Sequence, residues 1–316
     1  MGGLTLRGAI PANLLPFHPD YSIDEVAYRR HLRWLADVDG VETIVVNGHA
    51  AEVSSLTRDE RRRALAIAAD EVGDRVQLVA GIFTDGSLEA AELARDARDE
   101  GMAGVLVLPP ACFQWGANLR PEMALAHFGT IAERVGIPMI VFQYPVANGW
   151  GYSTEVLLRL IEIPTVVGIK EWSQDIVVFE RNLRSVRAQR PDVAILSSFS
   201  ASLYASLELG ADGLISGMGS VVADLQAQLF AAVQARDVNT ARALNDRLYP
   251  LASAFYAPPF VDMHNRMKEA LVLLGRLERA VVRPPLVRIT DAERAHIAEA
   301  LRQAGLLAAA PALAAR

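Results

Sequence analysis

The chain has 316 residues, of which 52% are hydrophobic and 22% are charged, and its formal net charge at pH 7 is −6. This composition is typical of a soluble protein with a large core, and the negative charge does not favour a nucleic-acid-binding surface. No run reaches the roughly 18 apolar residues of a membrane span, and the first residues lack the apolar core of a signal peptide. The single cysteine, Cys112, rules out an internal disulfide and is consistent with a reducing cytoplasm, where we expect the protein to reside.

Short apolar runs alternate with longer amphipathic stretches along the first two thirds of the chain. The runs are rich in β-branched residues, which predicts buried parallel strands. They cover residues 9–17, 43–47, 76–83, 104–108, 139–144, 165–172, 193–198 and 213–216. The stretches between them have a helical pattern and cover residues 24–38, 58–72, 87–100, 121–135, 153–162, 175–189 and 201–209.

Helix start signals support this division into strands and helices. Ser22, Thr57, Ser87 and Ser153 stand shortly before acidic residues, an arrangement that caps the N-terminus of a helix. Eight strand–helix units in a chain of this length predict an α/β fold, a closed (β/α)8 TIM barrel, over residues 1–222. A doubly wound open sheet is the alternative, but the glycine fingerprint of a dinucleotide site is missing after the first strand.

The strand signal disappears beyond residue 222. Helical patterns follow and are interrupted by two proline pairs, Pro258-Pro259 and Pro284-Pro285. These patterns cover residues 223–236, 238–256, 261–275 and 291–305. We therefore predict a C-terminal helical domain over residues 223–316.

Lysine is scarce in this chain. Lys170 and Lys268 are the only lysines, and every other basic residue apart from histidine is arginine. Arginine cannot lose its proton near neutral pH, so a lysine retained in an apolar run indicates a need for an amine. Lys170 lies near the end of the predicted strand 165–172, where burial would lower its pKa and leave a neutral nucleophile for a carbonyl group. The alternative is that its amine simply reaches solvent from the strand end.

The predicted barrel places Lys170 where such folds carry their chemistry, at the C-terminal end of a strand. Alternation along the strand puts Gly168 and Trp172 on the same face as the lysine. We expect the small Gly168 to leave room for a ligand beside the amine. Position and residue type together favour a catalytic role for Lys170.

The motif Gly168-Ile169-Lys170-Glu171 after an apolar strand resembles the lysine signature of the dihydrodipicolinate synthase and N-acetylneuraminate lyase family. The similarity extends over nearly the whole chain. Further matches are Pro16-Phe17, Gly48 to Glu52 with Leu56-Thr57, Ala80-Gly81, Pro109-Pro110, Pro145, and Gly213 to Ser216. The resemblance implies a class I lyase, which forms a Schiff base between its lysine and a 2-keto acid, on a barrel with C-terminal helices. We expect no cofactor and no metal, and the resemblance implies a homotetramer built as a dimer of dimers.

The family's loop after the second strand holds the substrate carboxylate with backbone amides and hydroxyl groups. Here His49 and Ala50 replace the usual hydroxyl pair, and Ala51 replaces a glycine. Backbone amides can still bind an anion there. His49 adds a hydrogen-bond donor or a group that titrates near pH 7. The residues that the resemblance assigns to substrate binding are Gly48, Ala50, Phe142, Gly168 and Ile215.

The family's fifth strand carries a tyrosine that relays protons. Phe142 stands at that position here, and Tyr144 follows two residues later on the same face. We therefore expect Tyr144 or His49 to move the proton, the alternative for Tyr144 being that it only packs at the rim. The arginine that synthases carry two residues beyond the following proline is Ala147 here. We do not expect true dihydrodipicolinate synthase activity.

Three functions remain open. The first is a Schiff-base aldolase or dehydratase acting on a 2-keto acid, with 2-keto-3-deoxy sugar acids and pyruvate-derived aldols as candidates. The second is a metal-dependent aldolase, although the six histidines show no pairing at metal-ligand spacing. The third is a barrel that binds a small molecule without catalysis. Polar residues near strand ends favour a hydroxylated substrate; they are Asn47, Ser54, Ser55, Gln143 and Tyr144.

Overall fold

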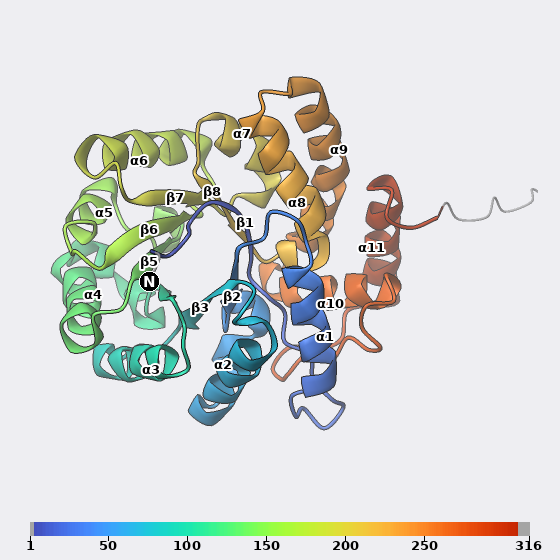
Figure 1. Ribbon diagram of the computed structural model, residues 1–316, viewed down its shortest axis with the longest axis horizontal. Helices are drawn as coiled ribbons and strands as arrows, with labels where there is room; N and C mark the ends of the chain where they lie inside the picture. The colour runs from blue at the N-terminus through green and yellow to red at the C-terminus, as the bar shows by residue number, and fades with distance from the viewer. Residues whose placement is uncertain (1–2, 309–316) are drawn as a thin grey trace, which may run out of the picture.

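The computed structural model describes residues 3–308 and shows eight parallel strands arranged as a barrel with helices around it (Figure 1). The strands are β1 Gly8–Pro11, β2 Thr43–Val46, β3 Gln77–Ile82, β4 Gly104–Val107, β5 Met139–Gln143, β6 Val166–Glu171, β7 Ala194–Ser197 and β8 Gly213–Ser216. They pair in the order β1-β8-β7-β6-β5-β4-β3-β2. A parallel bridge between Ala12 and Val45 joins β1 to β2, so the sheet closes on itself.

One helix follows each strand, and three more helices follow the barrel. The barrel helices are α1 Glu25–Ala36, α2 Arg58–Val72, α3 Ser87–Asp99, α4 Glu122–Val135, α5 Thr154–Leu160, α6 Ile176–Gln189, α7 Leu203–Glu208 and α8 Gly219–Gln234. The C-terminal helices are α9 Val238–Phe255, α10 Met263–Leu273 and α11 Asp291–Gln303, which lie together on one side of the barrel (Figure 1). The predicted (β/α)8 barrel with a helical C-terminal extension is confirmed.

The first strand is shorter than predicted. β1 ends at Pro11, although the apolar run continues to Phe17 and Phe17 is buried. The backbone amide of Leu14 donates a hydrogen bond to the Ser220 hydroxyl at 2.9 Å instead of to a strand. An apolar run therefore predicts burial, and burial here occurs beyond the end of the strand pairing.

Two of the four predicted helix caps are present. Thr57 caps α2 with a reciprocal capping box, and the Ser153 hydroxyl caps α5. Asp24 rather than Ser22 caps α1, because Asp24 stands directly before the helix and its carboxylate accepts from the first turn. Ser87 is the first residue of α3 rather than its cap.

The eighth barrel helix starts earlier than the sequence pattern indicated. α8 begins at Gly219, and its backbone bends at Val222, where φ is −136° and ψ is 44°. The helix contacts both β1 and α9, so it connects the barrel to the C-terminal helices. The predicted boundary between residues 222 and 223 falls at this bend, and the division into two domains stays a prediction.

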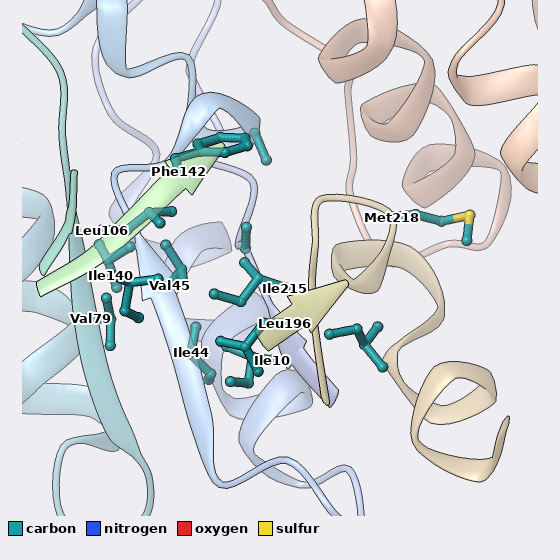
Figure 2. Packing of buried hydrophobic residues seen from close by; sticks show 14 of the residues in the cluster. Ile10, Ile44, Val45, Val79, Leu106, Ile140, Phe142, Leu196, Ile215 and Met218 are labelled. Carbon is teal, nitrogen blue, oxygen red and sulfur yellow. The ribbon is translucent and has the colours of Figure 1, made fainter. Parts of the chain in front are cut away.

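Buried apolar side chains, most of them aliphatic, pack on the strands of the barrel. Figure 2 shows residues of this kind, and each of those named next is at most 4% exposed. They are Ile10, Ile44, Val45, Val79, Leu106, Ile140, Phe142, Leu196 and Ile215. The barrel is therefore a packed core rather than a pore, and its chemistry belongs at the strand ends. Among the helices of residues 3–308, none combines the length and the hydropathy that a membrane crossing requires.

Candidate active site

Lys170 lies near the C-terminal end of β6 and is only 6% exposed. It is in register with Phe142 on β5 and with Leu196 on β7. The next residue, Glu171, is also buried and accepts a hydrogen bond from the Asn182 amide at 3.0 Å. Since successive residues of a strand point to opposite faces, this bond anchors the outer side of β6 and holds Lys170 inward.

The Lys170 amine has an apolar environment. Its nitrogen lies 3.9 Å from the centre of the Phe142 ring, and it makes no ion pair within the part of the chain that the structure describes. Burial lowers the pKa of Lys170 to about 7, because the protein interior disfavours the charged form. A large share of this amine is therefore neutral and nucleophilic at physiological pH.

Lys170 opens into a cavity of about 590 Å³. The cavity is lined by residues from the strand ends and from the C-terminal region, because α9 and α10 meet the barrel at this end. The lining residues are Ala12, His49, Ala50, Ser54, Phe83, Phe142, Tyr144, Pro145, Asn148, Trp150, Lys170, Trp172, Gln174, Ser198, Gly217, Tyr256, Phe260, Val261, Met263, His264 and Met267. This volume is in the range of small-molecule binding sites.

His49 and Tyr144 come from different elements of the barrel and contact each other. His49 begins η1 His49–Ala51, the short 3-10 helix after β2, and Tyr144 follows β5. The Nε2 atom of His49 and the hydroxyl of Tyr144 form a close hydrogen bond. The two residues that we expected to transfer protons are therefore adjacent, although they are separated by 95 positions in sequence.

Burial keeps both of these side chains neutral. It lowers the pKa of His49 to about 3, and the charges of His264 and Lys170 act in the same direction. Burial also raises the pKa of Tyr144 well above its ordinary value. Of the two roles considered for His49, titration near pH 7 does not agree with this lowered pKa, whereas the role in hydrogen bonding is kept. The pair can pass a proton along its hydrogen bond but does not store a charge at neutral pH.

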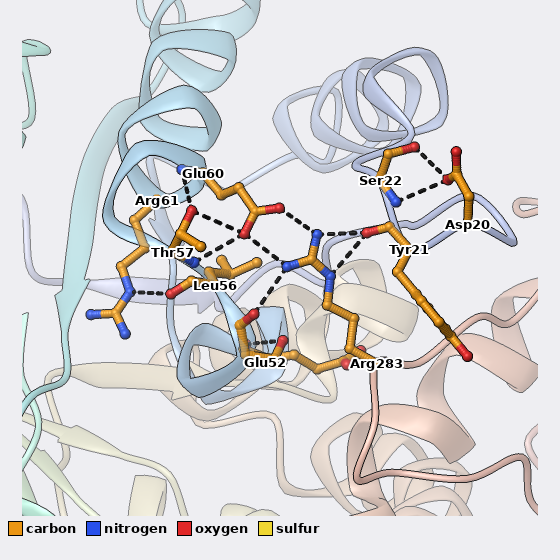
Figure 3. A network of polar contacts seen from close by, with 10 residues as sticks. Asp20, Tyr21, Ser22, Glu52, Leu56, Thr57, Glu60, Arg61 and Arg283 are labelled. Carbon is orange, nitrogen blue, oxygen red and sulfur yellow. Dashed lines mark hydrogen bonds and ion pairs between the residues drawn. The ribbon is translucent and has the colours of Figure 1, made fainter.

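The loop that carries His49 is tied to the C-terminal region through Glu52. Glu52 has a left-handed backbone, with φ of 55°, and its carboxylate lies 2.5 Å from the Lys268 amine of α10. The same carboxylate accepts the backbone amide of Arg283 at 2.9 Å. Figure 3 shows the Arg283 guanidinium bonded to the Tyr21 carbonyl and to Glu60, so the segment around Arg283 holds this loop, the start of α2 and the chain before α1 together.

The other predicted binding residues have different places. Ala50 and Phe142 line the cavity beside Lys170, whereas Gly48, Gly168 and Ile215 are not among its lining residues. A side chain added at Gly168 would meet Leu6 at 2.7 Å, so Leu6 fills the space that we expected a ligand to use. Ile215 is fully buried in the barrel core. Within residues 3–308, no three His, Cys, Asp or Glu side chains form a group that could hold a metal ion.

Most of the polar residues at the strand ends serve the fold rather than the cavity. The Asn47 amide donates to the Arg61 carbonyl at 2.9 Å. The side-chain amide of Gln143 donates to the Tyr152 carbonyl and accepts the Tyr152 backbone N–H. The Ser55 hydroxyl bonds to the backbone of its own loop. Of the polar residues that we took as indicators of a hydroxylated substrate, only Ser54 and Tyr144 line the cavity. These polar residues therefore give little support for a hydroxylated substrate.

The C-terminal contribution to the cavity was missed from the sequence. Tyr256, Phe260, Met263, His264 and Met267 all line it. The Tyr256 hydroxyl also accepts the backbone amide that follows β8, that of Met218, at 3.2 Å. The local pattern gave no sign of this role, because these residues read as an ordinary helix and its preceding turn. Only the docking of α10 on the barrel turns them toward Lys170.

Comparison with known proteins identifies the family. A model of the dihydrodipicolinate synthetase family matches residues 5–304. The 4-hydroxy-tetrahydrodipicolinate synthase of Methylobacterium radiotolerans is 33% identical over 308 residues, which cover 97% of this chain and 98% of that protein. The enzyme of the same name from Nitrobacter hamburgensis is 32% identical over 303 residues, which cover 95% of this chain and 97% of that protein.

Solved structures agree with the sequence comparison. The prophage protein YagE of E. coli K12, a dihydrodipicolinic acid synthase family member solved in complex with pyruvate, has a TM-score of 0.87 and 25% identity. The match covers 96% of this chain and 99% of that chain. The lysine motif, the barrel and these comparisons lead to one conclusion: the chain belongs to the dihydrodipicolinate synthetase family.

Proposed function

We propose that this protein is a class I aldolase-type lyase that binds a 2-keto acid as a Schiff base on Lys170. The observation that carries the proposal is a buried lysine, with a pKa lowered to about 7, that opens into a cavity of about 590 Å³. A neutral amine adds to a ketone and loses water to form an iminium ion. That ion accepts the electron pair of a neighbouring bond, so the bond can break.

Proton transfer is assigned to the pair of Tyr144 and His49. Forming the iminium requires a proton for the departing water, and aldol cleavage requires removal of a hydroxyl proton from the substrate. Phe142 has no hydroxyl and cannot supply either. Tyr144 lines the cavity beside Phe142, with ring centres 4.4 Å apart, and its hydroxyl is bonded to His49. This arrangement supports a relay in which Tyr144 contacts the substrate and His49 contacts Tyr144.

We assign the substrate carboxylate to the loop after β2, at the point where η1 begins. Ala50 lines the cavity, and the first amides of a 3-10 helix have no acceptor inside the helix. The family resemblance places the carboxylate at the same loop, which includes Gly48. Pyruvate, which is bound in the related E. coli structure, is the simplest acid with these features.

The cavity supports a reaction other than the one for which the curated relatives are named. Those relatives are 4-hydroxy-tetrahydrodipicolinate synthases. Here none of the cavity-lining residues, all of which lie in the described part of the chain, is an arginine, and Ala147 stands where synthases carry one. A second carboxylate would find no guanidinium to pair with it.

Borohydride trapping tests the proposal. Sodium borohydride added with pyruvate should reduce the imine and add mass to the peptide that carries Lys170. The peptide that carries Lys268 is the internal control, because that amine is held by Glu52. The Lys170→Ala variant should lose both the adduct and catalysis. An unmodified Lys170, with turnover retained in Lys170→Ala, would sink the proposal.

We further propose that the protein assembles as a homotetramer. Trp115 and Leu119 are 84% and 78% exposed on the segment between β4 and α4, and Val146 is 38% exposed. Large apolar residues exposed together favour a contact with another chain. Light scattering at micromolar protein concentration should give about four times 34.3 kDa, whereas a monomer mass would refute the assembly.

A further inference from the structure

Aromatic rings dominate the wall of the Lys170 cavity. Seven of its 21 lining residues are aromatic, whereas aromatic residues make up 7% of the chain. They are Phe83, Phe142, Tyr144, Trp150, Trp172, Tyr256 and Phe260. The buried side chains on the strands below the cavity are, by contrast, mostly aliphatic. The packing of the barrel therefore does not explain why aromatic residues gather around the cavity.

These rings form a continuous wall that starts at the reactive amine. The Tyr144 ring lies 5.1 Å from Trp172, and Trp172 lies 5.3 Å from Phe260. Phe260 in turn stacks on Tyr256 with ring centres 5.5 Å apart and an angle of 22°. The distances are those of stacked and edge-to-face aromatic contacts. A planar ring attached to a substrate on Lys170 would extend the same series of contacts.

The cavity offers little to a charged or polyhydroxylated group. Lys170 is the single Asp, Glu, Lys or Arg among its described lining residues. Ser54, Asn148 and Gln174 line it too, but all three are exposed and therefore lie at its mouth. Phe142 and Tyr144, at 4% and 3% exposed, form its deep part. The other polar lining groups, which include Ser198, Tyr256 and His264, are neutral and few, so a group with several hydroxyls or a charge would find fewer partners there than in water.

We propose that the substrate carries an aryl group on the carbon that leaves the 2-keto acid, and that the wall of Trp172, Phe260 and Tyr256 binds that ring. This inference rests on the proposed Schiff-base function and specifies its substrate class. The ring contacts on the wall and the absence of charged partners both select an apolar planar group over a sugar acid.

The reaction on such a substrate balances without a further reagent. The neutral Lys170 amine adds to the keto group of 4-hydroxy-4-phenyl-2-oxobutanoate and, with one proton taken from solvent, forms an iminium ion and releases water. The C3–C4 bond breaks, its electron pair enters the iminium to give an enamine, and the hydroxyl proton passes to the Tyr144–His49 pair. Benzaldehyde leaves, C3 takes that proton back to restore an iminium ion, and water hydrolyses this ion to pyruvate and the free amine, with one proton returned to solvent.

The test compares pyruvate release from two substrates. Purified full-length protein is assayed with 4-hydroxy-4-phenyl-2-oxobutanoate and with 2-keto-3-deoxygluconate, which has hydroxyl groups in place of the ring. We expect kcat/KM for the phenyl compound to be larger by about 100-fold, the discrimination that a fitted pocket gives between unlike groups. An equal or larger kcat/KM for the sugar acid overturns the inference.

Variants of the aromatic wall test whether Phe260 contributes to the preference for the phenyl compound. Phe260→Ala should lower kcat/KM for the phenyl compound about tenfold, because one aromatic contact is lost, and Phe260→Tyr should keep it. Tyr249→Ala is the matched control, since Tyr249 is 60% exposed on α9 and does not line the cavity. Circular dichroism checks that each variant is folded. An unchanged ratio between the two substrates in folded Phe260→Ala would overturn the assignment of the wall.

Borohydride trapping with pyruvate tests the Schiff-base function separately from the aryl substrate class, because pyruvate carries no aryl group. Trapping should be the same in the native protein and in the control variant Tyr249→Ala. Trapping without a preference for the phenyl compound overturns the substrate class alone. A failure to trap pyruvate on Lys170 overturns the proposed function and this inference together.

Discussion

The two lysines of this chain are buried to a similar degree but have opposite electrostatic surroundings. Lys170 is 6% exposed and Lys268 is fully buried, and each amine lies over an aromatic ring, Phe142 at 3.9 Å and Phe17 at 4.3 Å. Lys268 pairs with the Glu52 carboxylate at 2.5 Å and donates to the Val281 carbonyl at 2.8 Å. Lys170 has no such acid beside it.

The difference shows that burial alone does not make a reactive amine. Burial lowers the pKa of both lysines, but for Lys268 the carboxylate of Glu52 opposes that change. The Glu52 carboxylate favours the charged form of Lys268, and the pair joins α10 to the loop that carries His49. Lys170 has no compensating charge, so it is the amine that can become neutral near pH 7.

The largest effect that we expect concerns the neutral groups around Lys170. Tyr144→Phe and His49→Ala should each lower kcat by about 10²–10⁴, because each removes one member of the proton relay. Steady-state pyruvate release with each variant measures this. Tyr249→Phe is the control, because that tyrosine is exposed and distant from the cavity. Retention of kcat within about threefold in both variants would show that water or the substrate moves the proton.

The second prediction tests the pairing of Lys268. Lys268→Met should lower the free energy of unfolding by about 3–5 kcal/mol, because Glu52 would remain buried without its cation. Urea denaturation at pH 7 measures the loss. The double variant Lys268→Met with Glu52→Gln should be more stable than Lys268→Met alone, since the unpaired charge is gone. A loss below about 1 kcal/mol would mean that the pair behaves like an exposed ion pair.

The third prediction concerns Lys170, whose replacement should raise rather than lower the free energy of unfolding. Lys170→Met should raise the free energy of unfolding at pH 7 by a few kcal/mol, because the folded pKa of Lys170 is about 7 and the unfolded value is about 10.4. Between these values the unfolded chain binds more protons, so the penalty from Lys170 is full below pH 7 and fades toward pH 10. The gain measured in urea should shrink over that range. A destabilised Lys170→Met at pH 7 would contradict the comparison of the two lysines.

The smallest effect is a pH profile. Below pH 7, kcat/KM should rise about tenfold per pH unit and then level off, because the neutral fraction of Lys170 limits imine formation. The residual activity of His49→Ala should show the same midpoint, since burial keeps His49 neutral in this range. A profile that keeps rising to pH 10 would assign Lys170 an ordinary pKa and remove its distinction from an exposed lysine.

The architecture could be predicted from local pattern, and the same pattern singles out Lys170 as the candidate nucleophile. The strands and helices follow from short-range periodicity, and a sequence motif identified Lys170 at the end of the sixth strand. The same periodicity predicted a first strand that is too long, because Phe17 is buried without pairing to another barrel strand. The prediction that Ser22 caps the first helix was wrong for a related reason, since the cap depends on the exact turn at which the helix begins.

The sequence by itself thus determined the barrel and the family, and it pointed to Lys170 as the candidate nucleophile, because each of these depends on residues that are neighbours in the chain. Only the tertiary structure decided which lysine is paired, since Lys268 and Glu52 are 216 positions apart. It also decided that His49 is half-buried and bonded to Tyr144, and that Phe260 and Tyr256 complete the cavity. The physical reason is that desolvation and ion pairing depend on which distant segments pack together, and here the docking of α10 on the barrel determines both.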